Sequence, residues 1–165
     1  MKFTVTDIAN VAMMVATIEG GKLALSSLPN IEVVSLFIIV YTCFFGNITL
    51  LAVAIFVLIE GFLYGIGWWF YSYVIAWPIL FWLVKIFRKK ADHVTMAMVS
   101  GVFGFSFGLI CELPYALMFG TRSAFSWWVA GIPFDIVHGI GNFVLCLLLY
   151  KPLMTALKTV RNCER

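Results

Sequence analysis

Residues 70–87 read FYSYVIAWPILFWLVKIF, and the five residues that follow, 88–92, read RKKAD. The first segment carries one charge, Lys85, and has about the length that a helix needs to cross a bilayer. The basic cluster after it is typical of a loop on the cytoplasmic side of a membrane. Together the two segments predict a transmembrane helix that ends at the cytoplasmic face.

The rest of the 165-residue chain repeats this pattern of apolar segments separated by short polar breaks. The apolar runs are continuous rather than alternating, which favours helices over the strands of a membrane barrel. We therefore expect an all-α integral membrane protein, formed by a single domain over residues 1–165. Its six transmembrane helices are predicted at about 5–24, 32–45, 48–64, 70–87, 94–118 and 131–157.

The composition excludes several other classes of protein. Hydrophobic residues make up 63% of the chain and charged residues 12%, whereas a soluble domain has about 25% charged residues. A soluble enzyme and a disordered chain are both excluded on this ground. The net charge of +3 is not gathered in one stripe, so no nucleic-acid partner is expected. The four cysteines form no CxxC pair, and we expect neither a metal site nor a cofactor.

The basic residues predict the orientation of the chain in the membrane. With six spans, nine of the eleven Lys and Arg residues fall on the side of the two termini, and only Lys22 and Arg122 fall on the other side. Because loops rich in Lys and Arg stay in the cytoplasm, both termini are predicted to be cytoplasmic.

Acidic and aromatic residues gather toward the opposite, outer side. Five acids are predicted in the outer parts of five different helices, namely Glu19, Glu32, Glu60, Glu112 and Asp135, and five of the six tryptophans lie on the same side. Carboxylates within a membrane are costly and often functional. We interpret the set as an outward-facing polar cavity with aromatic walls. Two alternatives remain open, which are carboxylates that reach the membrane surface and an ordinary aromatic belt.

Asp135, His138 and Asn142 are spaced i, i+3 and i+7, which places them on one face of a helix. They are interpreted as a row of hydrogen-bonding groups for a ligand, or alternatively as a polar network that fixes the sixth helix to its neighbours. The predicted substrate-binding residues are Asn30, Glu32, Glu60, Trp68, Trp69, Trp77, Glu112, Trp128, Asp135, His138 and Asn142.

Small residues four apart predict places where two helix backbones approach closely. Gly61 and Gly65 form one such pair, and Gly104 and Gly108 form another. Ala12 and Ala16 form a third pair, in the cytoplasmic half of the first helix, and are predicted to bind a partner protein.

With these segments in view, the whole chain resembles the substrate-binding S component of an energy-coupling factor (ECF) vitamin transporter. Four features carry the resemblance. They are Ala12-xxx-Ala16, the segment Leu28-Pro29-Asn30-Ile31-Glu32, the aromatic segment Gly65-Ile66-Gly67-Trp68-Trp69 with Trp77-Pro78 after it, and the segment from Gly131 to Asn142 followed by Lys151-Pro152-Leu153.

The resemblance implies a high-affinity vitamin-binding subunit in the plasma membrane of a prokaryote. Its partners would be a transmembrane T component, bound through Ala12 and Ala16, and two ATPase subunits. The chain itself has no GxxxxGK[ST] phosphate loop and is expected not to be an enzyme. The outer acids favour a cationic or donor-rich ligand, with cobalamin preferred and hydroxymethylpyrimidine or thiamine next. Two other functions remain open, a membrane scaffold subunit and a lipid-modifying enzyme that uses Asp135 and His138 for acid–base chemistry.

Overall fold

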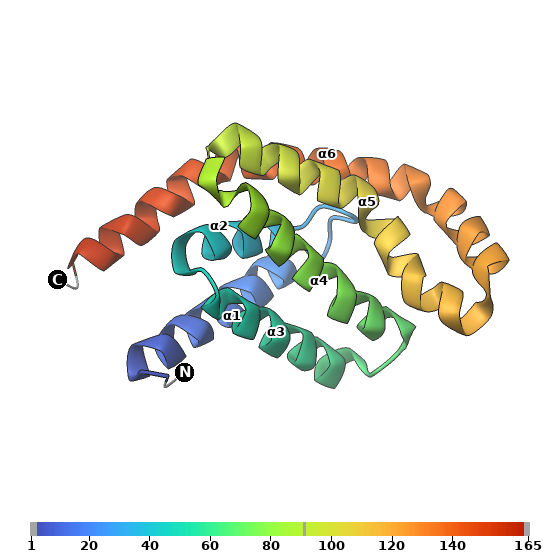
Figure 1. Ribbon diagram of the computed structural model, residues 1–165, viewed down its shortest axis with the longest axis horizontal. Coiled ribbons are helices and arrows are strands. Elements are labelled where there is room, and N and C mark those ends of the chain that lie inside the picture. The colour runs from blue at the N-terminus through green and yellow to red at the C-terminus, as the bar shows by residue number, and fades with distance from the viewer. Residues whose placement is uncertain (1–2, 91, 164–165) are drawn as a thin grey trace.

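The computed structural model describes residues 3–90 and 92–163, and every regular element in these ranges is a helix. The chain runs back and forth along one direction (Figure 1). Both termini, the α2–α3 turn and the loop before α5 lie toward one end, and the α3–α4 and α5–α6 connections lie toward the other. The elements are α1 (Val5–Ala24), α2 (Val34–Phe45), α3 (Ile48–Tyr64), α4 (Trp68–Phe87), a single 3-10 turn η1 (Arg88–Lys90), α5 (His93–Phe119) and α6 (Thr121–Cys163).

Among the described residues, three helices are long and apolar enough to cross a membrane, and they are α4, α5 and α6. The helices α2 and α3 are apolar but shorter, with 12 and 17 residues. The first helix has 20 residues but carries Asp7, Glu19 and Lys22. The length and composition of the three long helices are compatible with a membrane protein.

The sixth helix differs most from its expected bounds. It begins at Thr121 rather than near residue 131, and it continues to Cys163. The connection between the predicted helices 94–118 and 131–157 is reduced to Gly120, whose φ of +87° is a conformation that favours glycine. Pro133 lies inside the helix instead of starting it, because the apolar residues before it continue the helix. The ten added residues bring Trp127 and Trp128 onto α6.

The second helix also begins later than expected, at Val34 instead of Glu32. Glu32 belongs to the preceding connection, and its Oε2 accepts a hydrogen bond from the backbone N–H of Ser35 at 2.9 Å. This carboxylate therefore satisfies one of the free N–H groups at the start of α2.

The start of α5 is fixed by Asp92. Its Oδ1 accepts hydrogen bonds from the backbone N–H groups of Val94 and Thr95, and its Oδ2 accepts one from the Thr95 hydroxyl at 2.6 Å. The hydroxyl and backbone groups of Thr95 hold the pKa of Asp92 below its usual range. This N-cap marks the end of the basic connection after α4 and the start of α5, which is the longest helix that precedes α6.

The fifth and sixth helices pack along each other, and glycines allow the contact. A Cβ atom placed on Gly104 would lie 2.8 Å from the Cα of Gly139 and 2.9 Å from the carbonyl oxygen of His138. The expected close approach at Gly104 is thus found, with α6 as the partner. It holds the face of α6 that carries Asp135 and His138 directly against α5.

Candidate functional site

Five of the predicted binding residues line one cavity of about 190 Å³. The residues come from several parts of the chain, with two from the α1–α2 connection, one from α4 and two from α6. They are Asn30, Glu32, Trp77, Asp135 and His138. The remaining wall consists of Lys22, Val34, Tyr73 and Phe107.

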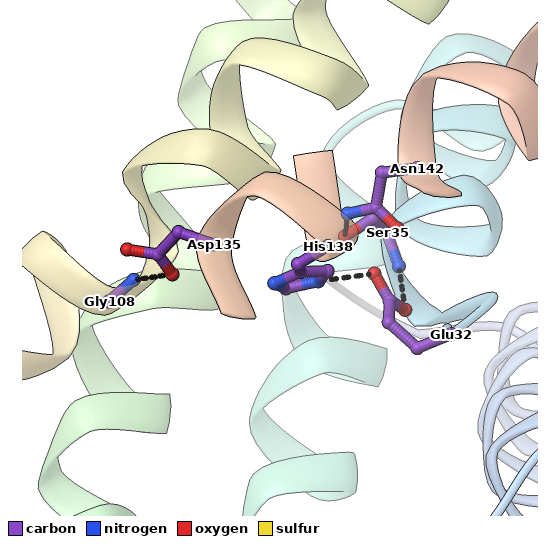
Figure 2. Close-up of polar contacts among 6 residues, drawn as sticks. All are labelled: Glu32, Ser35, Gly108, Asp135, His138 and Asn142. Carbon is purple, nitrogen blue, oxygen red and sulfur yellow. Dashed lines mark hydrogen bonds and ion pairs between the residues drawn. The ribbon is translucent and has the colours of Figure 1, made fainter. Parts of the chain in front are cut away.

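The polar face of α6 is buried as expected, since the exposed fractions are 8% for Asp135, 6% for His138 and 2% for Asn142. Figure 2 shows that the three side chains have different partners. His138 Nε2 lies 3.3 Å from Glu32 Oε1, and Asn142 Nδ2 donates to Ser35 Oγ at 3.1 Å. This face therefore has features of both interpretations made from the sequence, the polar network between helices and the row of groups for a ligand. His138 and Asn142 tie α6 to the start of α2, while Asp135 remains toward the cavity.

Asp135 is held by α5 through one oxygen only. The backbone N–H of Gly108 donates to Asp135 Oδ1 at 2.9 Å (Figure 2), and a Cβ on Gly108 would lie 2.4 Å from Oδ2. Oδ2 is buried and has no hydrogen-bond partner among the described residues. A buried carboxylate oxygen without a partner is unfavourable unless a ligand or water supplies a donor.

A second unpartnered group lies in the same cavity wall. Trp77 is 2% exposed, and its Nε1 has no acceptor within the described part of the chain. The indole ring packs against Tyr73 and Phe107, with centroid distances of 5.4 Å and 5.6 Å. The cavity wall thus contains a carboxylate with one unpartnered oxygen, an indole with an unpartnered N–H, the rings of Tyr73, Trp77 and Phe107, and the ion-paired Lys22. Such a wall suits a small aromatic ligand that carries an amine.

Glu60 lies beside the cavity rather than in its wall. It is almost fully buried on α3 and forms an ion pair with Lys22 of α1, whose ammonium group lies over the Tyr64 ring at 4.5 Å. Lys22 lines the cavity, so Glu60 acts on the cavity through the position of this lysine. Lys22, Tyr73 and Phe107 also line the cavity but were not predicted from the sequence as binding residues. The one available signal was the spacing of Tyr73 and Trp77, which are four residues apart and therefore share a helix face.

Six of the eleven predicted residues do not line this cavity. Glu60 lies beside it, and Asn142 donates to Ser35 instead of reaching the cavity wall. The other four are Trp68, Trp69, Glu112 and Trp128. Trp68 and Glu112 line a separate hollow near the α5–α6 connection, and Glu112 and Trp128 line a further one formed by residues of α5 and α6. Trp69 packs its ring against Tyr73, which lines the cavity. The single outer cavity expected from the sequence is therefore divided, because α5 and α6 extend beyond the other helices at that end (Figure 1).

The two predicted partner-binding residues, Ala12 and Ala16, are exposed on α1. Within residues 3–90 and 92–163, no three His, Cys, Asp or Glu side chains are grouped so that they could hold a metal ion. No protein-family model, curated protein sequence or solved structure matches this chain.

Proposed function

We propose that this chain is the vitamin-binding S component of an ECF-type importer in a prokaryotic plasma membrane. The observation that carries the proposal is the cavity between the α1–α2 connection, α4 and α6. There the free Oδ2 of Asp135 and the free Nε1 of Trp77 lie among aromatic rings. Such a combination of apolar walls and a few placed polar groups is characteristic of small-molecule binding sites.

The size of the cavity bears on the choice of vitamin. Its volume of about 190 Å³ is below the roughly 300–1,000 Å³ of pockets for drug-sized ligands. Cobalamin, the vitamin preferred from the sequence, is far larger and would require the helices to separate. An aminopyrimidine such as hydroxymethylpyrimidine, or the pyrimidine end of thiamine, matches both the size and the free carboxylate. We therefore place the aminopyrimidine vitamins first.

The arrangement of the helices supports the proposed six-span topology. Successive helices run in opposite directions, and both ends of the chain lie at one end of the molecule (Figure 1). The same end carries the basic turn that contains Arg88 and Lys89. With both termini cytoplasmic, the connection that contains Asn30 and Glu32 faces the outside, as uptake requires.

The direct test is a titration of the purified, folded chain with vitamins, in which intrinsic tryptophan fluorescence reports binding. Because Trp77 lines the cavity, saturable quenching by hydroxymethylpyrimidine or thiamine is expected. Cobalamin, riboflavin, pantothenate and folate serve as comparison ligands, with inner-filter controls for the coloured ones. Saturable quenching by one of these comparison ligands instead would identify that ligand as the vitamin and replace the aminopyrimidine assignment. No response to any ligand would favour the scaffold function.

Replacing Asp135 with asparagine is expected to weaken binding of an aminopyrimidine by about 5- to 150-fold. The amide oxygen can still accept from the N–H of Gly108, but the charged acceptor for the ligand is lost. A hydrogen bond to a buried group of this kind is worth about 1–3 kcal/mol when it is removed. Isothermal titration calorimetry measures the change, and Glu112→Gln is the matched control outside the cavity. Equal affinity in Asp135→Asn and the unchanged chain would contradict this role.

Replacing Ala12 or Ala16 with tryptophan is expected to prevent assembly with the T component while leaving vitamin affinity unchanged. Both alanines are exposed on α1, and a large ring would hold a partner helix away. Co-purification of the four-subunit complex measures assembly, and Ala130→Trp on the exposed face of α6 is the control. Full assembly of the Ala12 and Ala16 variants would show that this face is not the contact.

A further inference from the structure

The hollow near the α5–α6 connection is separate from the vitamin cavity and has a different chemistry. It encloses about 270 Å³ and is lined by Trp68 of α4, by Glu112, Tyr115 and Phe119 of α5, and by Trp127 of α6. Four of the five residues are aromatic. Tyr115 is central, with ring centroids 5.8 Å from Trp68, 4.5 Å from Phe119 and 6.1 Å from Trp127.

Glu112 is the only charged group in this wall, and it has no cationic partner in the described structure. The ion pairs within residues 3–90 and 92–163 join Lys22 with Glu60 and His138 with Glu32. Oε2 of Glu112 is buried and accepts no hydrogen bond from the described residues. A carboxylate that has a buried, unpartnered oxygen beside aromatic rings is unfavourable as an isolated charge, and a bound cation would compensate it.

The kind of cation follows from the small number of metal ligands and hydrogen-bond acceptors in the wall of the hollow. A metal ion needs several oxygen, nitrogen or sulfur ligands, and the wall supplies only one carboxylate. A primary ammonium needs acceptors for its three N–H groups. A quaternary ammonium has no N–H groups, and it binds to the faces of Trp and Tyr rings with a diffuse negative charge nearby.

We propose that Trp68, Tyr115, Trp127 and Glu112 form a binding site for a quaternary or highly methylated ammonium group. The group can belong to a small solute such as choline or to the headgroup of a choline lipid, since both present the same trimethylammonium chemistry. The α5–α6 connection, near which the site lies, is toward the end of the molecule opposite the two termini (Figure 1). It uses none of the residues that line the vitamin cavity, and it stands independently of the proposed transport function.

The test measures binding of tetramethylammonium chloride to the purified full chain in detergent by isothermal titration calorimetry, against sodium chloride at equal ionic strength. Saturable binding is expected, with the affinity lowered at least tenfold in Glu112→Gln and in Trp127→Ala. Trp82→Ala is the matched control, because Trp82 on α4 is 58% exposed and Trp127 is 62% exposed. Its affinity is expected to be unchanged.

The neutral isostere of choline, 3,3-dimethylbutan-1-ol, separates a cation site from a merely apolar hollow. It is expected not to bind. Equal binding of the isostere, an undiminished affinity in Glu112→Gln, or no saturable binding of tetramethylammonium would each overturn the proposal. Circular dichroism of each variant establishes that it is folded, and the conservative Glu112→Gln keeps the test decisive where Trp127→Ala fails to fold.

Reconstitution into nanodiscs identifies the source of the group. If a lipid headgroup occupies the site, phosphatidylcholine nanodiscs will block the binding of tetramethylammonium and phosphatidylglycerol nanodiscs will not. If the occupant is a free solute, binding will be equal in both lipids. Either result supports the proposed ammonium-binding site and identifies whether a lipid headgroup or a free solute occupies it.

Discussion

Replacing Lys22 with methionine is expected to destabilise the protein by about 3 kcal/mol. The ammonium group of Lys22 is the ion-pair partner of Glu60, whose side chain is 2% exposed. The other oxygen of Glu60, Oε1, has no partner among the described residues. Removing one member of a buried pair leaves an uncompensated charge and costs about 3–5 kcal/mol. The lower value applies because the side chain of Lys22 is 27% exposed.

The measurement is thermal unfolding in a mild detergent, where a fall of roughly 6–12 °C in the midpoint corresponds to this loss. The double variant Lys22→Met with Glu60→Met is expected to recover most of the stability, since it removes both charges. Lys85→Met is the matched control, because Lys85 donates to the exposed Asn47 side chain and lies 6.0 Å from the Phe81 ring centroid, with no ion pair among the described residues. Its effect is expected to stay within about 0.5 kcal/mol. A Lys22→Met variant as stable as the control would show that the pair does not hold α1 to α3.

Replacing Gly104 with alanine is expected to destabilise the protein by about 2–3 kcal/mol and to weaken ligand binding as well. The added Cβ meets the Cα and N of Gly139 and the carbonyl oxygen of His138, at 2.8–3.0 Å. All three are backbone atoms and cannot rotate away. Overpacking of this kind costs about 1–3 kcal/mol. Because α6 has to move away from α5, Asp135 and His138 move with it.

Gly131→Ala provides the comparison for this substitution. Gly131 also lies within α6, but a Cβ placed on it has no atom within 4 Å. Alanine is favoured over glycine inside a helix by about 0.5–1 kcal/mol, so Gly131→Ala is expected to leave stability unchanged or slightly higher. Unfolding midpoints and vitamin affinities of the two variants form the test. Equal behaviour of the two would mean that α5 and α6 separate easily at Gly104.

Most helix positions could be predicted from the sequence because apolar runs end at residues with clear physical roles. The Gly46-Asn47 turn, Gly65 and the cluster after Phe87 all interrupt the chain where the helices end. The sixth helix could not be placed in the same way. Gly131 and Pro133 resemble a helix start, but α6 continues through both, and the interruption at Gly120 is a single residue.

The site was predictable to the extent that it depends on local spacing. Asp135, His138 and Asn142 share a face, and all three are buried as a helical spacing of i, i+3 and i+7 predicts. Their partners depend on contacts far apart in sequence, since Glu32 is 106 residues from His138 and Ser35 is 107 residues from Asn142. No local pattern encodes those pairings, nor the separation of Glu112 from Asp135.

The short length of α2 has an electrical consequence in the proposed topology. Its 12 residues span about 18 Å, whereas the hydrocarbon core of a bilayer is about 30 Å thick. The irregular segment before it carries Asn30 and Glu32, and such backbone is tolerated at membrane depth where it lines an aqueous space. The membrane voltage then falls mainly across the inner part of the protein, along α2. A cation that enters the cavity from outside crosses little of that voltage, and its affinity will be nearly independent of the energised state of the cell.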